Sequence, residues 1–242
     1  MFADVTSANI VGYAGSELNG GTKRRLMVPQ FTSVSAKKAI KLKDLTPLCS
    51  TFEIRNNQIT ISQLQPSGKT IPGIDAKWNP TYSEWRTNNI SASEMEIPEG
   101  TGLYVLDGVA ATHVVTLQSA GEVNTTEDLV VMLNGGGRRT AMGNPFPVDV
   151  KMSDIIPEVV TEGKKLANNQ ITVSQLQSNG KTVPGIDAKW NPTYSEWRTN
   201  NVNASGMTIP AGQGLYVLCG PAETTMRVQL RITNPLKPKS AE

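Results

Sequence analysis

The sequence predicts an all-β protein made of two tandem homologous domains of the β-sandwich or jelly-roll type, with short helical turns. Two observations lead to this class. Residues 56–108 recur as residues 168–220 at an offset of 112, and 42 of the 53 positions are identical. Short segments that alternate apolar and polar residues are separated by turns rich in glycine and proline, which is typical of strands in sandwiches and barrels.

The repeat is a whole domain of about 110 residues rather than a short solenoid unit, because weaker similarity continues upstream of the identical stretch. Leu18–Gly21 resembles Leu133–Gly136 in this upstream part. Two such units fill a chain of 242 residues, which is long enough for two hydrophobic cores. We therefore expect a first domain at residues 1–119 and a second at residues 120–242.

The individual elements follow from periodicity. Apolar and polar residues alternate with the period of a half-buried strand in residues 58–65, 112–118 and 226–233. Residues 103–106 form a short apolar run between glycines, which also indicates a strand. The best candidates for helical turns are residues 41–48 and, in the second copy, residues 151–159.

The composition argues against an enzyme. The one histidine, His113, and the two cysteines, Cys49 and Cys219, each occur in only one copy of the repeat. A duplicated catalytic or metal site would need its residues in both copies, so we expect no enzymatic activity, no cofactor and no metal. The net charge of +2 gives no bulk attraction to nucleic acid. No apolar run reaches the roughly 18 residues of a membrane span.

All four tryptophans lie in one repeated stretch, residues 73–86 and 185–198. A hairpin turning at residues 79–81 would place Trp78 and Trp85 on neighbouring strands in cross-strand contact. Two interpretations remain open: the indoles form the core or an interface, or they form a surface for stacking on a sugar ring, flanked by polar side chains such as Asp75. The candidate assembly or sugar-stacking surface consists of Trp78, Asn79, Tyr82, Trp85 and Arg86, with the copies Trp190, Asn191, Tyr194, Trp197 and Arg198.

Three motifs together carry a resemblance. The chain opens with Ser7–Tyr13 (SANIVGY), continues with Gly-x-Asp-x-x-Trp-Asn, and closes each copy with Ile-Pro-x-Gly-x-Gly-Leu-Tyr-Val at residues 97–105 and 209–217. This pattern resembles an uncharacterised family of secreted, β-rich tandem-repeat proteins of anaerobic bacteria. The resemblance implies that a signal peptide has been removed and that the protein is extracellular or on the cell surface. It supplies no catalytic residues.

The principal hypothesis is a non-enzymatic, exported structural protein that self-assembles through its duplicated domains into a filament, tube or surface layer. If the contact between the two copies recurred between chains, it would be a head-to-tail contact that does not close. The expected strand donors to a neighbouring sheet edge are Ala8, Ile10, Val11, Tyr13, Val228, Leu230 and Ile232. The alternative is a bivalent carbohydrate-binding, lectin-like protein with one aromatic site per domain. The expected partners are thus copies of the same chain, or glycans.

Overall fold

The computed structural model describes residues 11–238, apart from residues 19, 22, 37, 64–74 and 176–186. Its regular structure is almost entirely antiparallel β, which confirms the predicted class. Within these described residues the helices are two short 3₁₀ turns, η1 at Leu42–Asp44 and η2 at Met152–Asp154.

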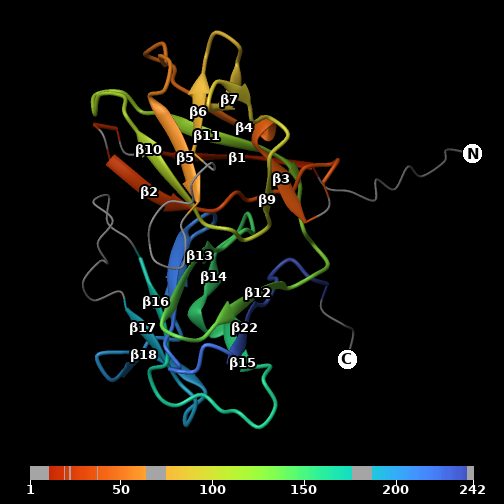
Figure 1. Ribbon diagram of the computed structural model, residues 1–242, viewed down its shortest axis with the longest axis vertical. Helices are drawn as coiled ribbons and strands as arrows, with labels where there is room; N and C mark the ends of the chain where they lie inside the picture. Colours follow the sequence, from red (N-terminus) through yellow and green to blue (C-terminus); the bar gives the residue numbers. More distant parts are fainter. Residues whose placement is uncertain are drawn as a thin grey trace, which may run out of the picture.

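Each half of the chain contributes eleven of the strands described (Figure 1). The strands of the first half are β1 Val11–Glu17, β2 Lys23–Met27, β3 Ala39–Lys41, β4 Leu45–Leu48, β5 Ile59–Gln63, β6 Ala76–Asn79, β7 Glu84–Thr87, β8 Ile90–Ser91, β9 Glu96–Pro98, β10 Leu103–Asp107 and β11 Thr116–Glu122. Those of the second half are β12 Leu129–Asn134, β13 Arg138–Gly143, β14 Val150–Lys151, β15 Ile155–Val159, β16 Ile171–Ser174, β17 Ala188–Asn191, β18 Glu196–Thr199, β19 Val202–Asn203, β20 Thr208–Ile209, β21 Gly214–Cys219 and β22 Arg227–Ile232.

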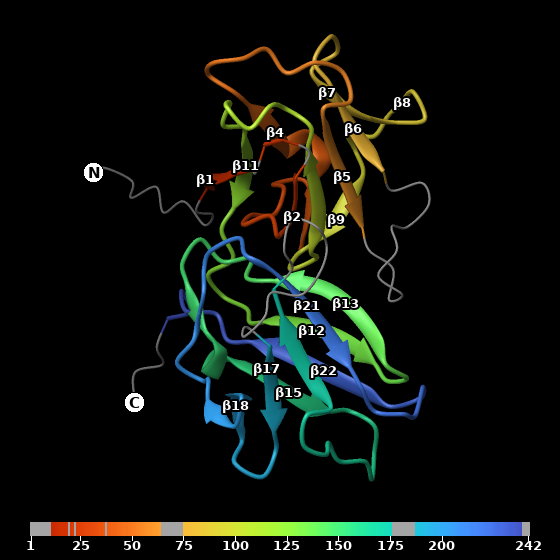
Figure 2. The same cartoon turned by 90° about the vertical axis from the view of Figure 1, so that its left-hand side faces the viewer.

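The same strand order appears in both halves. The first half has a three-stranded sheet, β1-β11-β4, a six-stranded sheet, β2-β10-β5-β6-β7-β8, and the pair β3-β9. The second half repeats this as β12-β22-β15, β13-β21-β16-β17-β18-β19 and β14-β20. Figure 2 shows the two halves stacked along the long axis of the molecule, each with its own sheets.

Each half closes around a separate core between its three-stranded and six-stranded sheets. One cluster of buried apolar side chains is confined to residues 18–117 and the other to residues 129–232. A buried indole links the two sheets in each half: Trp85 Nε1 donates to the carbonyl of Leu45 at 2.6 Å, and Trp197 Nε1 donates to the carbonyl of Ile155 at 2.7 Å. Each half is therefore a β-sandwich-like unit with its own interior.

The predicted tryptophan hairpin is present. Strands β6 and β7 pair antiparallel with Trp78 directly opposite Trp85, and the two rings meet edge to face with centroids 5.4 Å apart. The side-chain oxygen of Asn79 accepts the backbone N–H of Thr81 at 3.0 Å, which fixes the turn. The second copy repeats the ring pair at the same centroid distance.

Two sequence expectations need correction. Strand β11 crosses the expected boundary at residue 119, because its pairing with β1 continues as far as Glu122, so the boundary lies between Glu122 and Leu129. The expected helical turns shorten to three residues each and continue directly as strands β4 and β15. Pairing with the neighbouring strands β11 and β22 satisfies the backbone of these segments in extended form, which outweighs a weak local preference for helix.

The two halves meet through a reciprocal contact of their backbones. Met27, at the end of β2, forms an isolated antiparallel bridge with Gln213 of the second half. Met142 occupies the place of Met27 in the second half, and it forms the corresponding bridge with Thr101 of the first half. Each half thus uses the same two places of its fold to contact the other.

The residues that follow Met27 and Met142 also form equivalent hydrogen bonds between the two halves. The Val28 N–H donates to the carbonyl of Gly212 at 2.9 Å, and the Gly143 N–H donates to the carbonyl of Gly100 at 3.1 Å. The two halves are therefore related by an approximate two-fold axis, which makes the contact isologous. This corrects the expectation of a head-to-tail contact, because an isologous contact occupies the same patch on both partners and closes.

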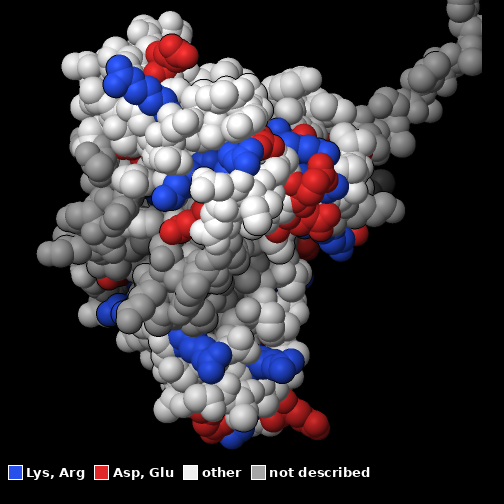
Figure 3. All heavy atoms as spheres, turned by 45° about the horizontal axis from the view of Figure 1, so that its top comes forward, with Lys and Arg blue, Asp and Glu red and all other residues white. Residues whose placement is uncertain are grey.

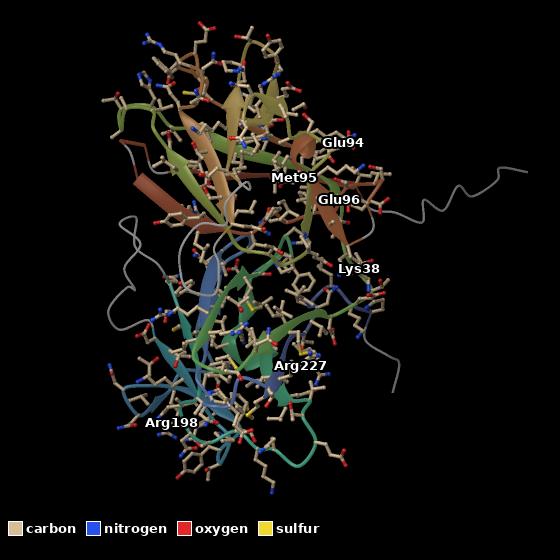
Figure 4. The ribbon with its side chains drawn as sticks, viewed as in Figure 1. Lys38, Glu94, Met95, Glu96, Arg198 and Arg227 are labelled. Atoms are coloured by element: carbon tan, nitrogen blue, oxygen red, sulfur yellow. The ribbon has the colours of Figure 1, made fainter. Side chains whose placement is uncertain are left out.

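A half-buried carboxylate lies beside this contact. The side chain of Asn124, in the connection between the halves, donates to Glu99 Oε1 at 3.0 Å. Burial raises the pKa of Glu99 above its ordinary value of 4.5, although the hydrogen bond from Asn124 and the charge of Lys38 act in the opposite direction. Lys38, which Figure 4 places at the level where the halves meet, forms an exposed ion pair with Glu127 at 2.6 Å.

Replacement of Glu99 by glutamine is expected to stabilise the protein at neutral pH. A carboxyl whose pKa is raised by folding stabilises the folded state only while it is protonated, and that contribution is lost as pH rises from about 4.5 through the folded pKa. Thermal unfolding should give equal midpoints for Glu99→Gln and the parent at pH 4 and a higher midpoint for the variant at pH 7. A gap that does not depend on pH, or one that also appears in the exposed Glu53→Gln control, would contradict this expectation.

Candidate functional site

Strand alternation places a row of polar side chains on the outer face of each six-stranded sheet. In β6, Ala76 and Trp78 are buried, while Lys77 and Asn79 point the other way, as does Asp75 just before the strand. On the neighbouring strand β7 the register places Arg86 opposite Lys77. Polar groups of both strands therefore gather on one face.

Two asparagine-rich loops complete this face. Asn88 and Asn89 form the two-residue turn between β7 and β8, with φ values of 49° and 64°, and Asn57, before β5, has a φ of 65°. Glycine adopts such left-handed conformations at the lowest cost, and asparagine is the side chain that tolerates them best. The chain thus keeps amide side chains at positions where glycine would fold more easily.

These strands and loops enclose a polar hollow in each half. The hollow of the first half measures about 400 Å³ and is lined by Asn56, Asn57, Asp75, Lys77, Asn79, Arg86, Asn88 and Asn89. The hollow of the second half measures about 440 Å³ and is lined by Asn168, Asn169, Asp187, Lys189, Asn191, Arg198, Thr199, Asn200 and Asn201. Apart from Thr199, the two linings consist of the same residue types at the same places of the repeat.

The arginine of each hollow is held by several partners. Arg86 donates through Nη1 to Glu84 Oε1 and through Nη2 to the carbonyl of Asn89, and its guanidinium lies 4.6 Å from the ring centroid of Tyr82. Arg198 makes the same set of contacts in the second half. A guanidinium held in this way presents its remaining donors in a fixed direction.

The lysine of each hollow, unlike the arginine, has no partner among the residues that the structure describes. Neither Lys77 nor Lys189 forms a hydrogen bond or ion pair with the other residues that the structure describes, whereas Asp75 accepts a hydrogen bond of 2.5 Å from Ser62. In the second half, Asp187 Oδ1 is buried and lacks a partner among the described residues. Each hollow therefore offers an ammonium donor.

The two hollows lie far apart. Strands β6 and β7 are near the opposite edge of their sheet from β2, which makes the contact between the halves, and β17 and β18 are placed in the same way relative to β13. In Figure 1, β6 and β7 occupy the top of the molecule and β17 and β18 its lower end. Figure 4 shows Arg198 at this lower end. Two sites at opposite ends can contact two separate ligands at once.

The surface charge gives no sign of a nucleic-acid interface on the face that Figure 3 shows. Basic and acidic side chains are interspersed there, and neither sign forms a continuous stripe. A surface of this kind lacks the basic footprint that drives binding to a phosphate backbone.

The candidate assembly or sugar-stacking surface divides into core and surface residues. Trp85 and Trp197 are fully buried, and Trp78 and Trp190 are 7% and 8% exposed, so the tryptophans belong to the cores. The idea that they form a surface for stacking or assembly is therefore wrong, because their strands face inward at these positions. The polar members of that set line the two hollows, namely Asn79, Arg86, Asn191 and Arg198. Tyr82 and Tyr194 are 65% and 66% exposed on the adjoining turns.

The expected strand donors also divide. Ala8 and Ile10 lie outside the described residues, whereas Val11 and Tyr13 are exposed on β1, an edge strand in which no residue is buried. The proposal that residues of β22 are donors is wrong, because this strand lies between β12 and β15 and is paired on both sides. Its inward-facing residues, Val228, Leu230 and Ile232, are fully buried in the second core.

Sequence reasoning missed most of the lining of the hollows. Asn56, Asn57, Lys77, Asn88 and Asn89 were not among the candidates. One signal was present: the pairs Asn56–Asn57 and Asn88–Asn89 both recur unchanged in the second copy. Their meaning depends on the strand order, which brings together loops about thirty positions apart.

The residues found in a single copy show no catalytic arrangement. Both cysteines are free, and burial raises the pKa of the Cys219 thiol to about 11, which keeps it protonated and unreactive at neutral pH. His113 Nδ1 lies 3.1 Å from the hydroxyl of Thr51, and its ring stacks on Phe52. In the described ranges, no group of three or more His, Cys, Asp or Glu side chains is placed to hold a metal ion.

Comparison of the chain with protein-family models, with curated proteins and with solved structures finds no match. Among the residues that the structure describes, no helix has the length and apolar character needed to cross a membrane.

Proposed function

We propose that this protein is a non-enzymatic, bivalent carbohydrate-binding protein whose two corresponding polar hollows each hold a sugar unit. The observation that carries the proposal is the recurrence of eight lining residues, type for type, in both hollows. The proposal adds that the protein acts outside the cell, where glycans are exposed, and this rests on the resemblance to secreted repeat proteins.

The chemistry of the lining supports a sugar in particular. Binding sites for most small molecules are largely apolar, with a few polar groups. The lining of these hollows is instead amide, carboxylate, ammonium and guanidinium. Sugar hydroxyls both donate and accept hydrogen bonds, and the amide group of asparagine does the same. The volume of each hollow lies within the usual range for ligand sites, which is about 300–1,000 Å³.

The test uses substitutions that leave the backbone unstrained. Asn88→Gly with Asn89→Gly removes two amides from the first hollow, and glycine accepts the left-handed turn that the asparagines now form. The corresponding pair, Asn200→Gly with Asn201→Gly, removes two amides from the second hollow. Screening the parent on an array of purified oligosaccharides identifies the probe, and calorimetry with that oligosaccharide measures stoichiometry.

The parent should bind two oligosaccharides per chain, each double variant one, and the combined variant none. The exposed Lys151→Ala serves as a control and should retain two sites, whereas Lys77→Ala should weaken only the first. The proposal is contradicted if the folded parent binds no glycan on the array, or if the combined variant binds the oligosaccharide as strongly as the parent does.

A second function has its own observation. Strand β1 forms the outer edge of its three-stranded sheet, and Val11 and Tyr13 on it are 54% and 84% exposed. Exposed edges without lysine or proline can accept a strand from another chain. We therefore also propose a structural role in which chains assemble into a filament, tube or layer through this edge, rather than through the contact between the halves.

Tyr13→Lys should abolish such assembly, because a charge on the edge strand opposes pairing. Light scattering over a series of micromolar concentrations, where the variant is not expected to associate in any other way, should show large particles for the parent and single chains for the variant. Tyr82→Lys, at another exposed tyrosine that lies on a turn, is the matched control. A parent that is a single chain at every concentration contradicts the structural role but leaves the binding proposal intact.

A further inference from the structure

The contact between the halves is unusual because each half carries both sides of it. The bridge pairs are Met27 with Gln213 and Met142 with Thr101, so one strand residue and one loop residue come from each half. Since the two halves have the same strand order, the contact surface of either half is complementary to itself.

The repeated Gly-x-Gly of the closing motif forms the loop side of this surface. The first glycine of each motif, Gly100 or Gly212, has a left-handed φ of 75° or 70°, and its carbonyl accepts a hydrogen bond from the other half. The second glycine allows close approach: a Cβ on Gly102 would lie 2.8 Å from the carbonyl carbon of Ala141, and one on Gly214 would lie 2.6 Å from that of Leu26. The motif is thus a docking element that each copy contains.

Neither half needs the other to complete its core or its sheets. Their cores are separate, and within the described residues the ladder pairs of named strands all stay inside one half. Only residues 123–128 connect β11 to β12. Opening the contact therefore exposes the docking surface of each half without unfolding either sandwich.

From these observations we propose that the partner of this docking surface is the corresponding surface of a second copy of the domain, from the same chain or from another. At high concentration two chains then exchange halves and form a closed two-fold dimer, in which the first half of each chain docks on the second half of the other. A short connection keeps the halves at an effective concentration in the millimolar range, so single chains dominate at micromolar concentration and the dimer becomes comparable near roughly 1 mM.

Cysteine pairs in the full-length chain test this exchange. Cys49→Ser and Cys219→Ala first remove the native thiols. One chain then carries Met27→Cys and the other Gln213→Cys, so that the two new thiols meet only if halves of different chains dock. After the mixture is held at about 1 mM, oxidation should give a disulfide-linked dimer of two 26.1 kDa chains, and at about 10 μM the fraction of chains in the dimer should fall roughly 25-fold.

Two controls keep the test decisive if a cysteine weakens the fold. A chain carrying both substitutions should cross-link within itself at every concentration, which reports that the contact is intact. The reciprocal pair, Thr101→Cys in one chain and Met142→Cys in the other, probes the other side of the two-fold axis. Two further substitutions test whether the docking surface itself is responsible. Addition of Gly102→Val should abolish the cross-linked dimer, whereas Tyr13→Lys should leave it unchanged.

Efficient cross-linking within the doubly substituted chain, with no dimer from either mixed pair at 1 mM, overturns the proposal.

Discussion

Replacement of Trp85 by alanine is expected to unfold the first domain and leave the second one folded. The Trp85 side chain is fully buried, donates its indole N–H to the carbonyl of Leu45, and packs edge to face on Trp78. Removing a buried tryptophan typically costs about 3–5 kcal/mol, and here a backbone carbonyl between the sheets also loses its donor. That loss is a large part of the ~5–15 kcal/mol by which a domain is usually stable.

The separate cores determine how this experiment is interpreted. The core around Trp197 shares no residue with the core around Trp85, so Trp197→Ala should unfold only the second domain. Two-dimensional NMR of each variant should show dispersed peaks for about half the chain and collapsed peaks for the rest. Tyr82→Ala, at an exposed tyrosine, should retain the complete dispersed spectrum. Loss of both domains in either tryptophan variant would contradict the independence of the cores.

Replacement of Gly102 by alanine is expected to separate the two domains without unfolding them. A Cβ there would lie 2.8 Å from one backbone atom of the second half and 2.9 Å from the next, and backbone cannot turn aside as a flexible side chain can. Overpacking of this kind usually costs about 1–3 kcal/mol. Besides two bridges and a few hydrogen bonds, the contact includes the side chains of Leu26 and Leu129 packed against the glycine loops, and the added Cβ lies next to one of the two bridges.

Small-angle scattering provides the measurement for this change. The radius of gyration should rise for Gly102→Ala and for the symmetry-related Gly214→Ala, while circular dichroism stays that of an all-β protein. Gly206→Ala is the matched control, since nothing lies within 4 Å of a Cβ at that position. An unchanged radius for both interface variants would show that the backbones can move apart slightly and keep the contact.

Local patterns in the sequence were sufficient for the fold class and for the tryptophan hairpin. The alternation in residues 75–79 fixes which side chains share a face, and Trp78 shares its face with the small apolar Ala76 rather than with Lys77. The same alternation therefore contained the information that the indoles face inward.

Features that depend on partners distant in the sequence could not be predicted. Residues 226–233 alternate as an edge or a central strand would, and only the pairing of β22 with both β12 and β15 distinguishes the two. The hollows depend on the order β5-β6-β7, which brings Asn57 and Asn88 to one face. The two-fold contact is a relation between complete domains, so no local pattern specifies it.

The paired indoles also give the protein an optical property. In each half, two tryptophan rings lie 5.4 Å apart at 67° and 65°, and these pairs account for all four tryptophans of the chain. Transition dipoles held so close and at fixed angles couple, and coupled chromophores give a paired positive and negative band in far-ultraviolet circular dichroism. Each domain thus contains its own spectroscopic label, with an amplitude that measures how many of the two cores are intact, without any added dye.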